Sequence, residues 1–465
     1  MKKLLKSCAD AFSVAFFFIG TLAFFALLYT NHVWGDVYIE QLMLAVFNDY
    51  TAIGSHIVIN YVLYVFVPAC LVTFFCVWKI NSDIKLNLAA LFMLSYVFLA
   101  VKAVEYWQNQ SVYSELYEKE YVNPKDVTFK FPEKKRNLIV LYLESMEEDY
   151  ADLALVSENL IPNLSNYMQK EMSFPNFYQM PSQDYTMAAI VSSMCGVPYR
   201  TPKGVNPYQI KNFLPHLKCY PQVLKENGYE NYVLKSTDLS FSNARKFYTL
   251  HGFDHLKDKT DIQNEIDLEK NKGTSWGYND RTYYRLAREE LLKIATENEP
   301  FMFVMVTLDT HEPDIYLDKQ CEKRFGDQKD VVRCADDMAS EFLAWLQQQD
   351  FYENTTVLVM GDHPETGKNN VYPEHKNRKI VQFILNPAEN TTAKPHEVWS
   401  TIDLAPTVLD ALGVDYANGS FGLGRSLLRA DPTLYETYHN RLSNEILKGS
   451  RVYDTFYHKN ESKNQ

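Results

Sequence analysis

Carboxylate and histidine side chains follow three short apolar runs of this sequence. The runs occupy residues 137–142, 301–308 and 356–360. Beyond them stand Glu144, His311 and the adjacent pair Asp362 and His363. Glutamate, aspartate and histidine supply the oxygen and nitrogen ligands that hold Mn²⁺, Mg²⁺ or Zn²⁺. The pattern predicts a divalent metal site at Glu144, Asp362 and His363; the structural alternative for the pair is a hydrogen bond that caps a loop.

A single threonine, Thr186, lies between a polar loop and a run of small apolar residues. The loop is residues 181–184, and the run at 187–191 suits a helix packed tightly on a sheet. Free N–H groups and the positive end of the dipole make a helix N-terminus favourable for phosphate. A metal-bound hydroxyl also ionises more easily and becomes a nucleophile. Threonine is a common N-cap as well, and we expect Thr186 to fill both roles.

Apolar runs that alternate with helical patterns indicate the fold class. A fourth run lies at residues 380–385, and helical patterns lie at residues 282–295 and 337–348. Continuous apolar runs are typical of strands buried on both faces of a parallel sheet. The alternation predicts an α/β fold with a mainly parallel central sheet flanked by helices. Functional groups in such folds gather outside the carboxyl ends of the strands, where the residues named above would meet.

Three long apolar segments precede this region and predict membrane helices. They lie at about residues 9–29, 57–77 and 86–104 of the 465-residue chain. Each is long enough to cross the hydrocarbon core of a bilayer. A signal peptide is the alternative for the first segment, but no small-residue cleavage site follows it. The net charge of -12 argues against a nucleic-acid partner, because no basic field is available to attract phosphates.

The distribution of lysines predicts the orientation of these helices. Lys2, Lys3 and Lys6 precede the first segment, and Lys79 and Lys85 lie between the second and third. The connection between the first and second segments carries only acidic charges. By the positive-inside rule the N-terminus is cytoplasmic, and the region after about residue 105 is outside. We predict a membrane domain at 1–105, a partly helical linker at 106–136, a catalytic domain at 137–435 and a C-terminal tail at 436–465.

Four of the seven cysteines fall in the predicted external region. They are Cys195, Cys219, Cys321 and Cys334. An even count in an oxidising compartment predicts disulfides, and three pairings are open. The local pairs Cys195–Cys219 and Cys321–Cys334 are the ones we favour. No C-x-x-C spacing points to metal binding by these residues.

Several motifs together resemble the membrane-anchored phosphoglycerol transferases of the alkaline phosphatase/sulfatase superfamily, such as the periplasmic-glucan transferases and, more distantly, the lipoteichoic acid synthases. The matching stretches are NLIVLYLES (137–145), DYTMAAIVSSMCGVP (184–198), HGFDHL (251–256), SWGYND (275–280), TLDTHEPD (307–314), GDH (361–363), TIDLAPTVLDALG (401–413) and FGLGRSLL (421–428). The resemblance covers roughly residues 135–430. It implies an alkaline phosphatase/sulfatase-like catalytic domain.

The resemblance also implies roles for individual residues. Thr186 would be the nucleophile, and Glu144, Thr186, Asp362 and His363 would bind one divalent metal ion. The oxygen ligands favour Mn²⁺ or Mg²⁺, with Zn²⁺ as the alternative. His311 would contact the phosphoglycerol group and Trp276 would line the substrate pocket; their structural alternatives are a loop histidine and a core tryptophan.

The cysteine of a sulfatase maturation motif is not expected here. In that motif proline stands two residues after the cysteine, but after Cys195 it stands one position later, at Pro198. Cys195 also lies too far beyond the strand-to-helix corner that Thr186 occupies. The sequence therefore argues against a formylglycine sulfatase.

The implied reaction moves phosphoglycerol from phosphatidylglycerol, through a covalent threonine adduct, to a hydroxyl of a cell-envelope glycan. The implied location is a bacterial inner membrane, with the catalytic domain in the periplasm. One alternative is a phosphoethanolamine transferase that acts on lipopolysaccharide. A second alternative, from a different class, is a non-catalytic relative that senses lipid. The presence of Glu144, Thr186, Asp362 and His363 argues against the second, because a binding module needs no nucleophile.

Overall fold

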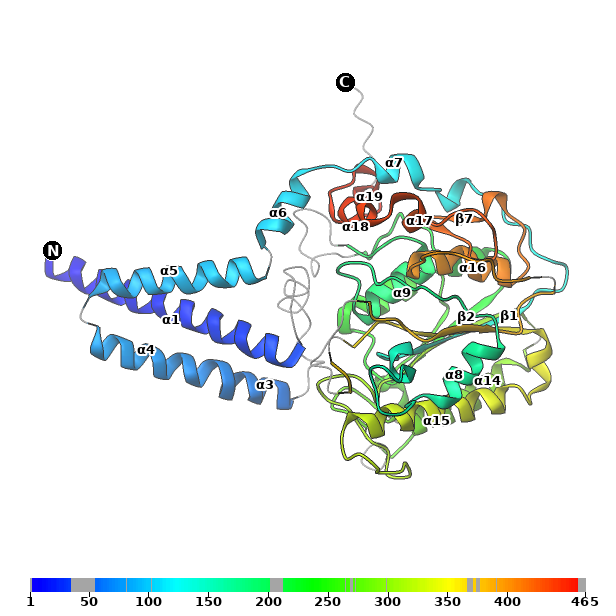
Figure 1. Cartoon of the computed structure of the whole chain (residues 1–465), viewed down its shortest axis with the longest axis horizontal. Coiled ribbons are helices and arrows are strands. Elements are labelled where there is room, and N and C mark those ends of the chain that lie inside the picture. Colours follow the sequence, from blue (N-terminus) through cyan, green and yellow to red (C-terminus); the bar gives the residue numbers. More distant parts are fainter. Residues whose placement is uncertain are drawn as a thin grey trace, which may run out of the picture. The chain divides into compact units, whose positions relative to one another are not determined.

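The computed structural model divides the chain into two compact units (Figure 1). It describes residues 2–34, 55–80, 82–101, 103–200, 212–263, 265–267, 271, 273–297, 299–365, 371–373, 377–389 and 391–458. The division falls between Asn109 and Gln110, inside helix α6 (Ala103–Ser111).

Among its described residues, the first unit contains three helical segments long and apolar enough to span a membrane, as predicted. These candidate spans are Asp10–Val33, Val58–Lys79 and Asp83–Ala100. Their helices are α1 (Lys2–Trp34), α3 (Ser55–Tyr61), a π-helical stretch (Val62–Phe66), α4 (Val67–Lys79) and α5 (Asp83–Ala100). The π-helical stretch lies just before Pro68, whose missing N–H interrupts regular helix bonding.

Small and polar side chains hold the three spans together. A Cβ on Gly20 of α1 would lie 3.0 Å from the Cα of Ala90 of α5, so glycine allows the close approach. The hydroxyls of Thr21 and Thr73 lie 3.1 Å apart and join α1 to α4. Close small-residue contacts and hydrogen bonds of this kind replace the hydrophobic driving force that is missing inside a lipid bilayer.

The second unit is built on a six-stranded sheet with the order β3-β2-β4-β1-β5-β6. The strands are β1 (Asn137–Leu143), β2 (Glu230–Lys235), β3 (His255–Lys257), β4 (Phe301–Val306), β5 (Thr355–Gly361) and β6 (Gln382–Leu385). All neighbours pair in parallel except β5 and β6. The predicted α/β fold with a mainly parallel sheet is confirmed.

Helices cover both faces of the sheet. As a result, β1, β4 and β5 are buried along their whole length. One face packs against α9 (Thr186–Cys195), α10 (Tyr220–Glu226) and α16 (Leu404–Ala411). The other packs against α8 (Pro162–Lys170), α14 (Asp280–Ile294) and α15 (Gln328–Leu346). Figure 1 shows α9 and α16 on one side of the strands and α14 and α15 on the other.

Two strands of this six-stranded sheet and one helix boundary differ from the sequence prediction. β2 was not predicted, because its partly exposed Glu230 and Tyr232 break the apolar run. β3 has three residues, too few to show a period. Helix α15 begins at Gln328 rather than near residue 337, because the Asp327 side chain accepts a hydrogen bond from the backbone N–H of Lys329 and caps the helix.

Segments predicted as a linker and a tail contribute to the core of the second unit. Helix α7 (Leu116–Glu120) buries its Leu116 and Tyr117. Near the C-terminus, α17 (Leu434–Tyr438), α18 (Asn440–Leu447) and α19 (Arg451–Asp454) pack into the same cluster. The ring centroids of Tyr121 and Phe456 lie 5.2 Å apart. The sequence did not predict these core contacts, because the tyrosine-rich segments show no clean period. Their aromatic rings pack between segments rather than along one helix face.

Both favoured disulfides, Cys195–Cys219 and Cys321–Cys334, are confirmed. Cys195 is the last residue of α9, and Cys219 directly precedes α10. The first bridge therefore links the two helices that cover the same face of the sheet.

Replacing Cys195 and Cys219 together by alanine should lower the free energy of unfolding by about 3 kcal/mol, because the cross-link restricts the unfolded chain. The bridge joins residues 24 positions apart, whereas Cys321–Cys334 spans 13. The matched variant, in which Cys321 and Cys334 are both replaced by alanine, should lose slightly less free energy of unfolding. Denaturant unfolding of the full-length protein in detergent, followed by near-UV circular dichroism, measures both losses. Unchanged stability of the first variant would contradict the expectation.

Candidate active site

The predicted ligands meet at the carboxyl edge of the sheet. Glu144 follows β1, and Asp362 and His363 follow β5, which is the direct neighbour of β1. One ligand atom from each of the three lies within 4.8 Å of the others. All three side chains are buried. Parallel pairing of adjacent strands thus brings together residues that are more than two hundred positions apart in the chain.

The orientation of these side chains fits a divalent cation. His363 Nε2 lies 3.4 Å from Asp362 Oδ2 and 3.6 Å from Glu144 Oε1. The other ring nitrogen, Nδ1, lies 2.9 Å from the Pro364 carbonyl oxygen and donates to it, which aims Nε2 at the carboxylates. Asp362 Oδ2 is buried without a hydrogen-bond partner among the described residues. An unsatisfied buried carboxylate oxygen is costly, so a bound cation is its natural partner.

Thr186 is the first residue of α9 and faces this set of ligands. Its Oγ1 donates a hydrogen bond to Glu144 Oε2 over 3.2 Å. The N-cap of the helix is Tyr185, and no side chain caps it. The expectation that Thr186 would itself be the N-cap is therefore wrong: the helix begins one residue earlier than that role requires. The hydroxyl is instead turned towards the carboxylates and is only partly buried.

Burial and mutual charge shift the protonation of the ligand residues. Burial and the neighbouring Glu144 raise the pKa of Asp362 to about 6. Burial disfavours the charged form of His363, but the carboxylates of Asp362 and Glu144 outweigh it and raise the pKa of His363 to about 9. Without a metal, His363 is therefore protonated at neutral pH and serves as the counter-ion of the two carboxylates.

A buried ion pair next to the site joins the two loops that carry the ligands. Arg378 Nε donates to Glu147 Oε2 over 2.8 Å, and Arg378 also donates to the Glu365 carbonyl. The backbone N–H of Glu365 donates to Glu147 Oε1 over 3.1 Å, and the hydroxyl of Tyr372 donates to Glu147. Glu147 is three residues beyond Glu144, and Glu365 is two beyond His363. We call this cluster of Glu147, Arg378, Tyr372 and Glu365 the clamp. The sequence analysis did not predict it, because neither Glu147 nor Arg378 lies in a recognisable motif.

The rings of His311 and Trp276 lie in contact with each other. Their ring centroids are 5.4 Å apart. Burial, followed by the charge of His363, lowers the pKa of His311 to about 4, so this ring is neutral at pH 7. In the part of the chain that the structure describes, His311 Nδ1 and Trp276 Nε1 are buried and have no hydrogen-bond partner. Both atoms are therefore available to a polar ligand.

Two further carboxylates, Asp280 and Asp309, hold the loop that carries His311. Asp280 accepts hydrogen bonds from the backbone N–H groups of Leu308 and Asp309, and Asp309 Oδ2 accepts one from the N–H of Asp280. Burial raises the pKa of Asp280 to about 7, and burial together with Asp280 raises the pKa of Asp309 well above its usual range. Their hydrogen bonds to the backbone assign them a positioning role.

Comparison with known proteins gives the chain its family. The sequence pattern of the sulfatase family matches residues 136–414, well over half of the chain. The chain belongs to the sulfatase family. It is 30% identical over 323 residues to phosphoglycerol transferase I of Salmonella typhimurium, an alignment that covers 66% of this chain and 41% of that protein. The chain thus spans less than half the length of this relative.

Solved structures share the fold. The lipoteichoic acid synthase LtaP from Listeria monocytogenes has a TM-score of 0.50 at 21% identity, covering 70% of this chain and 80% of that one. The lipooligosaccharide phosphoethanolamine transferase A of Neisseria meningitidis has a TM-score of 0.54 at 12% identity, covering 86% and 83%. These likenesses establish an alkaline phosphatase-like fold.

Cys195 does not occupy the position of the modified cysteine of a sulfatase. This agrees with the sequence analysis. It lies at the opposite end of α9 from Thr186 and is bonded to Cys219. Of the two residues, only Thr186 presents a reactive group to the ligand set.

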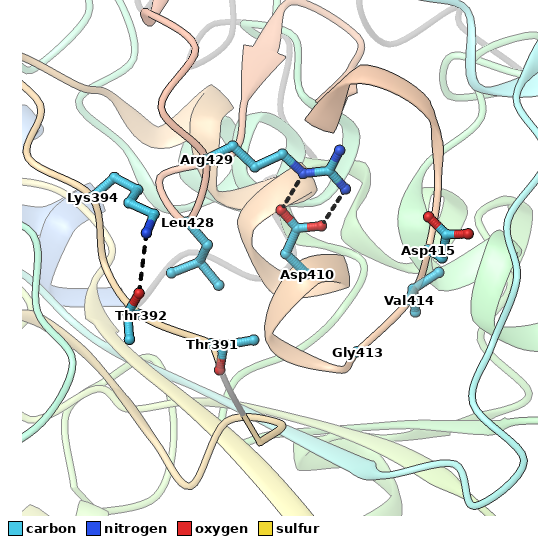
Figure 2. A pocket seen from close by; sticks show the side chains of 9 residues that line it. All are labelled: Thr391, Thr392, Lys394, Asp410, Gly413, Val414, Asp415, Leu428 and Arg429. Carbon is cyan, nitrogen blue, oxygen red and sulfur yellow. Dashed lines mark hydrogen bonds and ion pairs between the residues drawn. The ribbon is translucent and has the colours of Figure 1, made fainter.

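A cavity of about 340 Å³ lies elsewhere in the second unit and contains none of these residues. Figure 2 shows Arg429 paired with Asp410 and Lys394 bonded to Thr392 along its wall. Its Thr391 follows the end of β6, which runs antiparallel and so leads away from the carboxyl edge. Of the charged groups that line this cavity, Arg429 and Asp410 pair with each other.

The affinity for a divalent cation should rise about tenfold per pH unit between pH 6 and 9, because the cation must displace the proton of His363. Below pH 6 the dependence should steepen, since Asp362 also becomes protonated. Equilibrium dialysis with Mn²⁺ across this pH range measures it. Affinity independent of pH would show that His363 is not displaced by the ion. His363→Gln provides the control, in which the component centred near pH 9 disappears.

Replacing Arg378 by methionine should lower the free energy of unfolding by about 3–5 kcal/mol, because Glu147 would be left buried and unpaired. Combining Arg378→Met with Glu147→Gln should restore part of the loss. Arg425→Met, which breaks the pair with Glu120, is the control and should cost less, because the carboxylate of Glu120 is more exposed than that of Glu147. Chemical denaturation of the three variants gives the comparison, and equal losses would contradict a special role for the clamp.

Proposed function

We propose that this chain is a membrane-anchored, metal-dependent phosphoglycerol transferase. The observation that carries the proposal is the hydrogen bond from Thr186 Oγ1 to Glu144, within a ligand set completed by Asp362 and His363. A hydroxyl aimed at a divalent-cation site is suited to nucleophilic attack on phosphorus. The 30% identity to a phosphoglycerol transferase supports the choice of the transferred group.

The site residues have separate roles in the first step. A divalent ion held by Glu144, Asp362 and His363 would lower the pKa of the Thr186 hydroxyl and stabilise charge on phosphorus. Thr186 Oγ1 forms a bond to the phosphorus of phosphatidylglycerol, and its proton leaves towards Glu144. The bond from phosphorus to the diacylglycerol oxygen breaks, and diacylglycerol departs after taking up a proton from water. The product is a glycerophospho-threonine.

In the second step a hydroxyl of a cell-envelope glycan attacks the same phosphorus. His311 is neutral at pH 7 and can accept the proton of this hydroxyl. The bond from phosphorus to Thr186 Oγ1 breaks, and the threonine regains its proton. A covalent intermediate is useful here because the lipid donor and the glycan acceptor differ in polarity and need not bind together.

The proposed setting follows from the apolar helices and the lysine distribution. Three spans would anchor the chain in a bacterial inner membrane, with the N-terminus in the cytoplasm and the catalytic domain in the periplasm. The ion would be Mn²⁺ or Mg²⁺, since two carboxylates and a hydroxyl favour hard cations, with Zn²⁺ as the alternative. His311 and Trp276 would receive the glycerol phosphate.

Incubation of the full-length protein with labelled phosphatidylglycerol or phosphatidylethanolamine tests the proposal. Mass spectrometry should detect a glycerophosphate adduct on Thr186, and Thr186→Ala should abolish the adduct and slow diacylglycerol release at least about 10³-fold. Thr186→Ser, which keeps a hydroxyl, should retain part of the activity. An ethanolamine-phosphate adduct would instead identify a phosphoethanolamine transferase. Binding of lipid with no diacylglycerol release from either donor would identify a lipid sensor.

A further inference from the structure

Ser145, which directly follows the predicted ligand Glu144, adopts a backbone conformation that serine seldom takes. Its φ is 49°, in the left-handed region that favours glycine. The backbone N–H of Met146 donates to the Leu143 carbonyl oxygen over 3.3 Å, so Ser145 is the third residue of a tight turn. Turns that need a positive φ at this position usually carry glycine or asparagine. A serine here is strained, and strain of this kind points to a role for its side chain.

Backbone contacts from neighbouring segments hold this turn in place. A Cβ on Gly361 of β5 would lie 2.0 Å from the carbonyl oxygen of Met146, so the glycine lets the turn approach β5 closely. The same carbonyl oxygen accepts a hydrogen bond from the backbone N–H of Val381 over 3.0 Å. The N–H of Asp362 donates to the Leu143 carbonyl oxygen over 3.2 Å. Hydrogen bonds at both ends of the turn therefore maintain its left-handed residue.

In this conformation Ser145 contacts the carboxylates of both acidic ligands. Its hydroxyl donates to Glu144 Oε1 over 2.9 Å, and its backbone N–H donates to Asp362 Oδ1 over 2.8 Å. Asp362 Oδ1 accepts a second hydrogen bond from the N–H of His363 over 2.9 Å. Ser145 is only 2% exposed, so the surrounding protein shields these hydrogen bonds from water. One strained residue thus joins ligands that follow two different strands.

These hydrogen bonds determine which carboxylate oxygens face His363. Asp362 Oδ1 has two backbone donors, whereas Oδ2 has no hydrogen-bond partner among the described residues. His363 Nε2 lies 3.4 Å from that Oδ2 and 3.6 Å from Glu144 Oε1, the oxygen that the Ser145 hydroxyl holds. A ligand group that is already held in its binding orientation loses less conformational freedom when the ion binds.

We propose that Ser145 is the positioning residue of the metal site. Its hydroxyl and its backbone N–H orient Glu144 and Asp362 before a divalent ion binds, so that their oxygens converge with His363 Nε2. Residues that hold the ligands rather than the ion change metal affinity by about 10–100-fold. The proposal rests on the metal dependence of the proposed function and deepens it by naming the residue that prepares the metal site.

Two substitutions of Ser145 separate its hydroxyl from its backbone strain. Ser145→Ala removes the hydroxyl and keeps a Cβ at a φ of 49°, whereas Ser145→Gly removes the hydroxyl and relieves the strain. Both should weaken Mn²⁺ binding by the full-length protein about tenfold or more, because Glu144 loses the same hydrogen bond in each variant. Equilibrium dialysis at one fixed pH measures both affinities, since the proton on His363 competes with the ion.

The stability of the two variants should not follow their Mn²⁺ affinity. Without metal, Ser145→Gly should unfold at a higher denaturant concentration than Ser145→Ala, because glycine adopts a positive φ without steric cost. A merely structural role for Ser145 would make Mn²⁺ affinity follow stability, so that the glycine variant binds more tightly than the alanine variant. That result would overturn the proposal, as would parental Mn²⁺ affinity in either variant. If alanine prevents folding, the affinity of Ser145→Gly alone decides the question.

Ser242→Gly is the matched control for the loss of a strained serine. Ser242 also has a positive φ, of 54°, and it lies in the short helix Phe241–Asn243, outside the loops that carry the three ligands. Its replacement should leave the Mn²⁺ affinity unchanged. An equal loss of Mn²⁺ affinity in Ser242→Gly would attribute the effect to a general loosening of the fold and would overturn the role of Ser145.

The metal titration and the lipid assay fail independently. Absence of diacylglycerol release from the parent protein, with Mn²⁺ binding still dependent on the Ser145 hydroxyl, would remove the proposed transfer and leave the positioning role. Normal transfer and parental Mn²⁺ affinity in Ser145→Gly would remove only the role of Ser145. If the transfer and the role both hold, Ser145→Gly should need about tenfold more Mn²⁺ than the parent for half-maximal transfer.

Discussion

Parallel pairing of β1 with β4 on one side and β5 on the other is the constraint on which the site depends. The register sets Tyr142 opposite both Val306 and Met360, so the three strands end at nearly the same level. Hydrogen bonds continue the alignment beyond the strands, since the N–H of Glu144 donates to the hydroxyl of Thr307 over 2.9 Å. A shift of one residue in any of these pairs would turn a ligand to the opposite face of the sheet.

Compensation of buried charge differs between Glu147 and the acids of the predicted metal site. Glu147 is enclosed by Arg378 and Tyr372, so its charge is satisfied within the protein. Asp362 lies nearby, and its buried Oδ2 has no hydrogen-bond partner among the described residues, although the ring of His363 lies 3.4 Å away. A site that leaves one buried carboxylate oxygen without a hydrogen-bond partner is prepared for a cation.

The parts of the fold that could be predicted were those in which the residue pattern of a single segment indicates its structure. β1, β4 and β5 are buried on both faces, so their sequences are continuous apolar runs and their ends are visible. The membrane spans are visible for the same reason. β2 packs one face less completely, and its half-exposed Glu230 and Tyr232 remove the pattern.

The sequence by itself determined which residue types follow the apolar runs, and so the chemistry open to the site: Glu144, Asp362 and His363 as ligands, and Thr186 as a hydroxyl before a helix. Only the tertiary structure decided how these groups are used. It made Tyr185 the N-cap and joined Arg378 to Glu147 across 231 positions. The physical reason is that hydrogen-bond partners and counter-charges come from distant segments, and sheet register and helix packing alone bring them within reach.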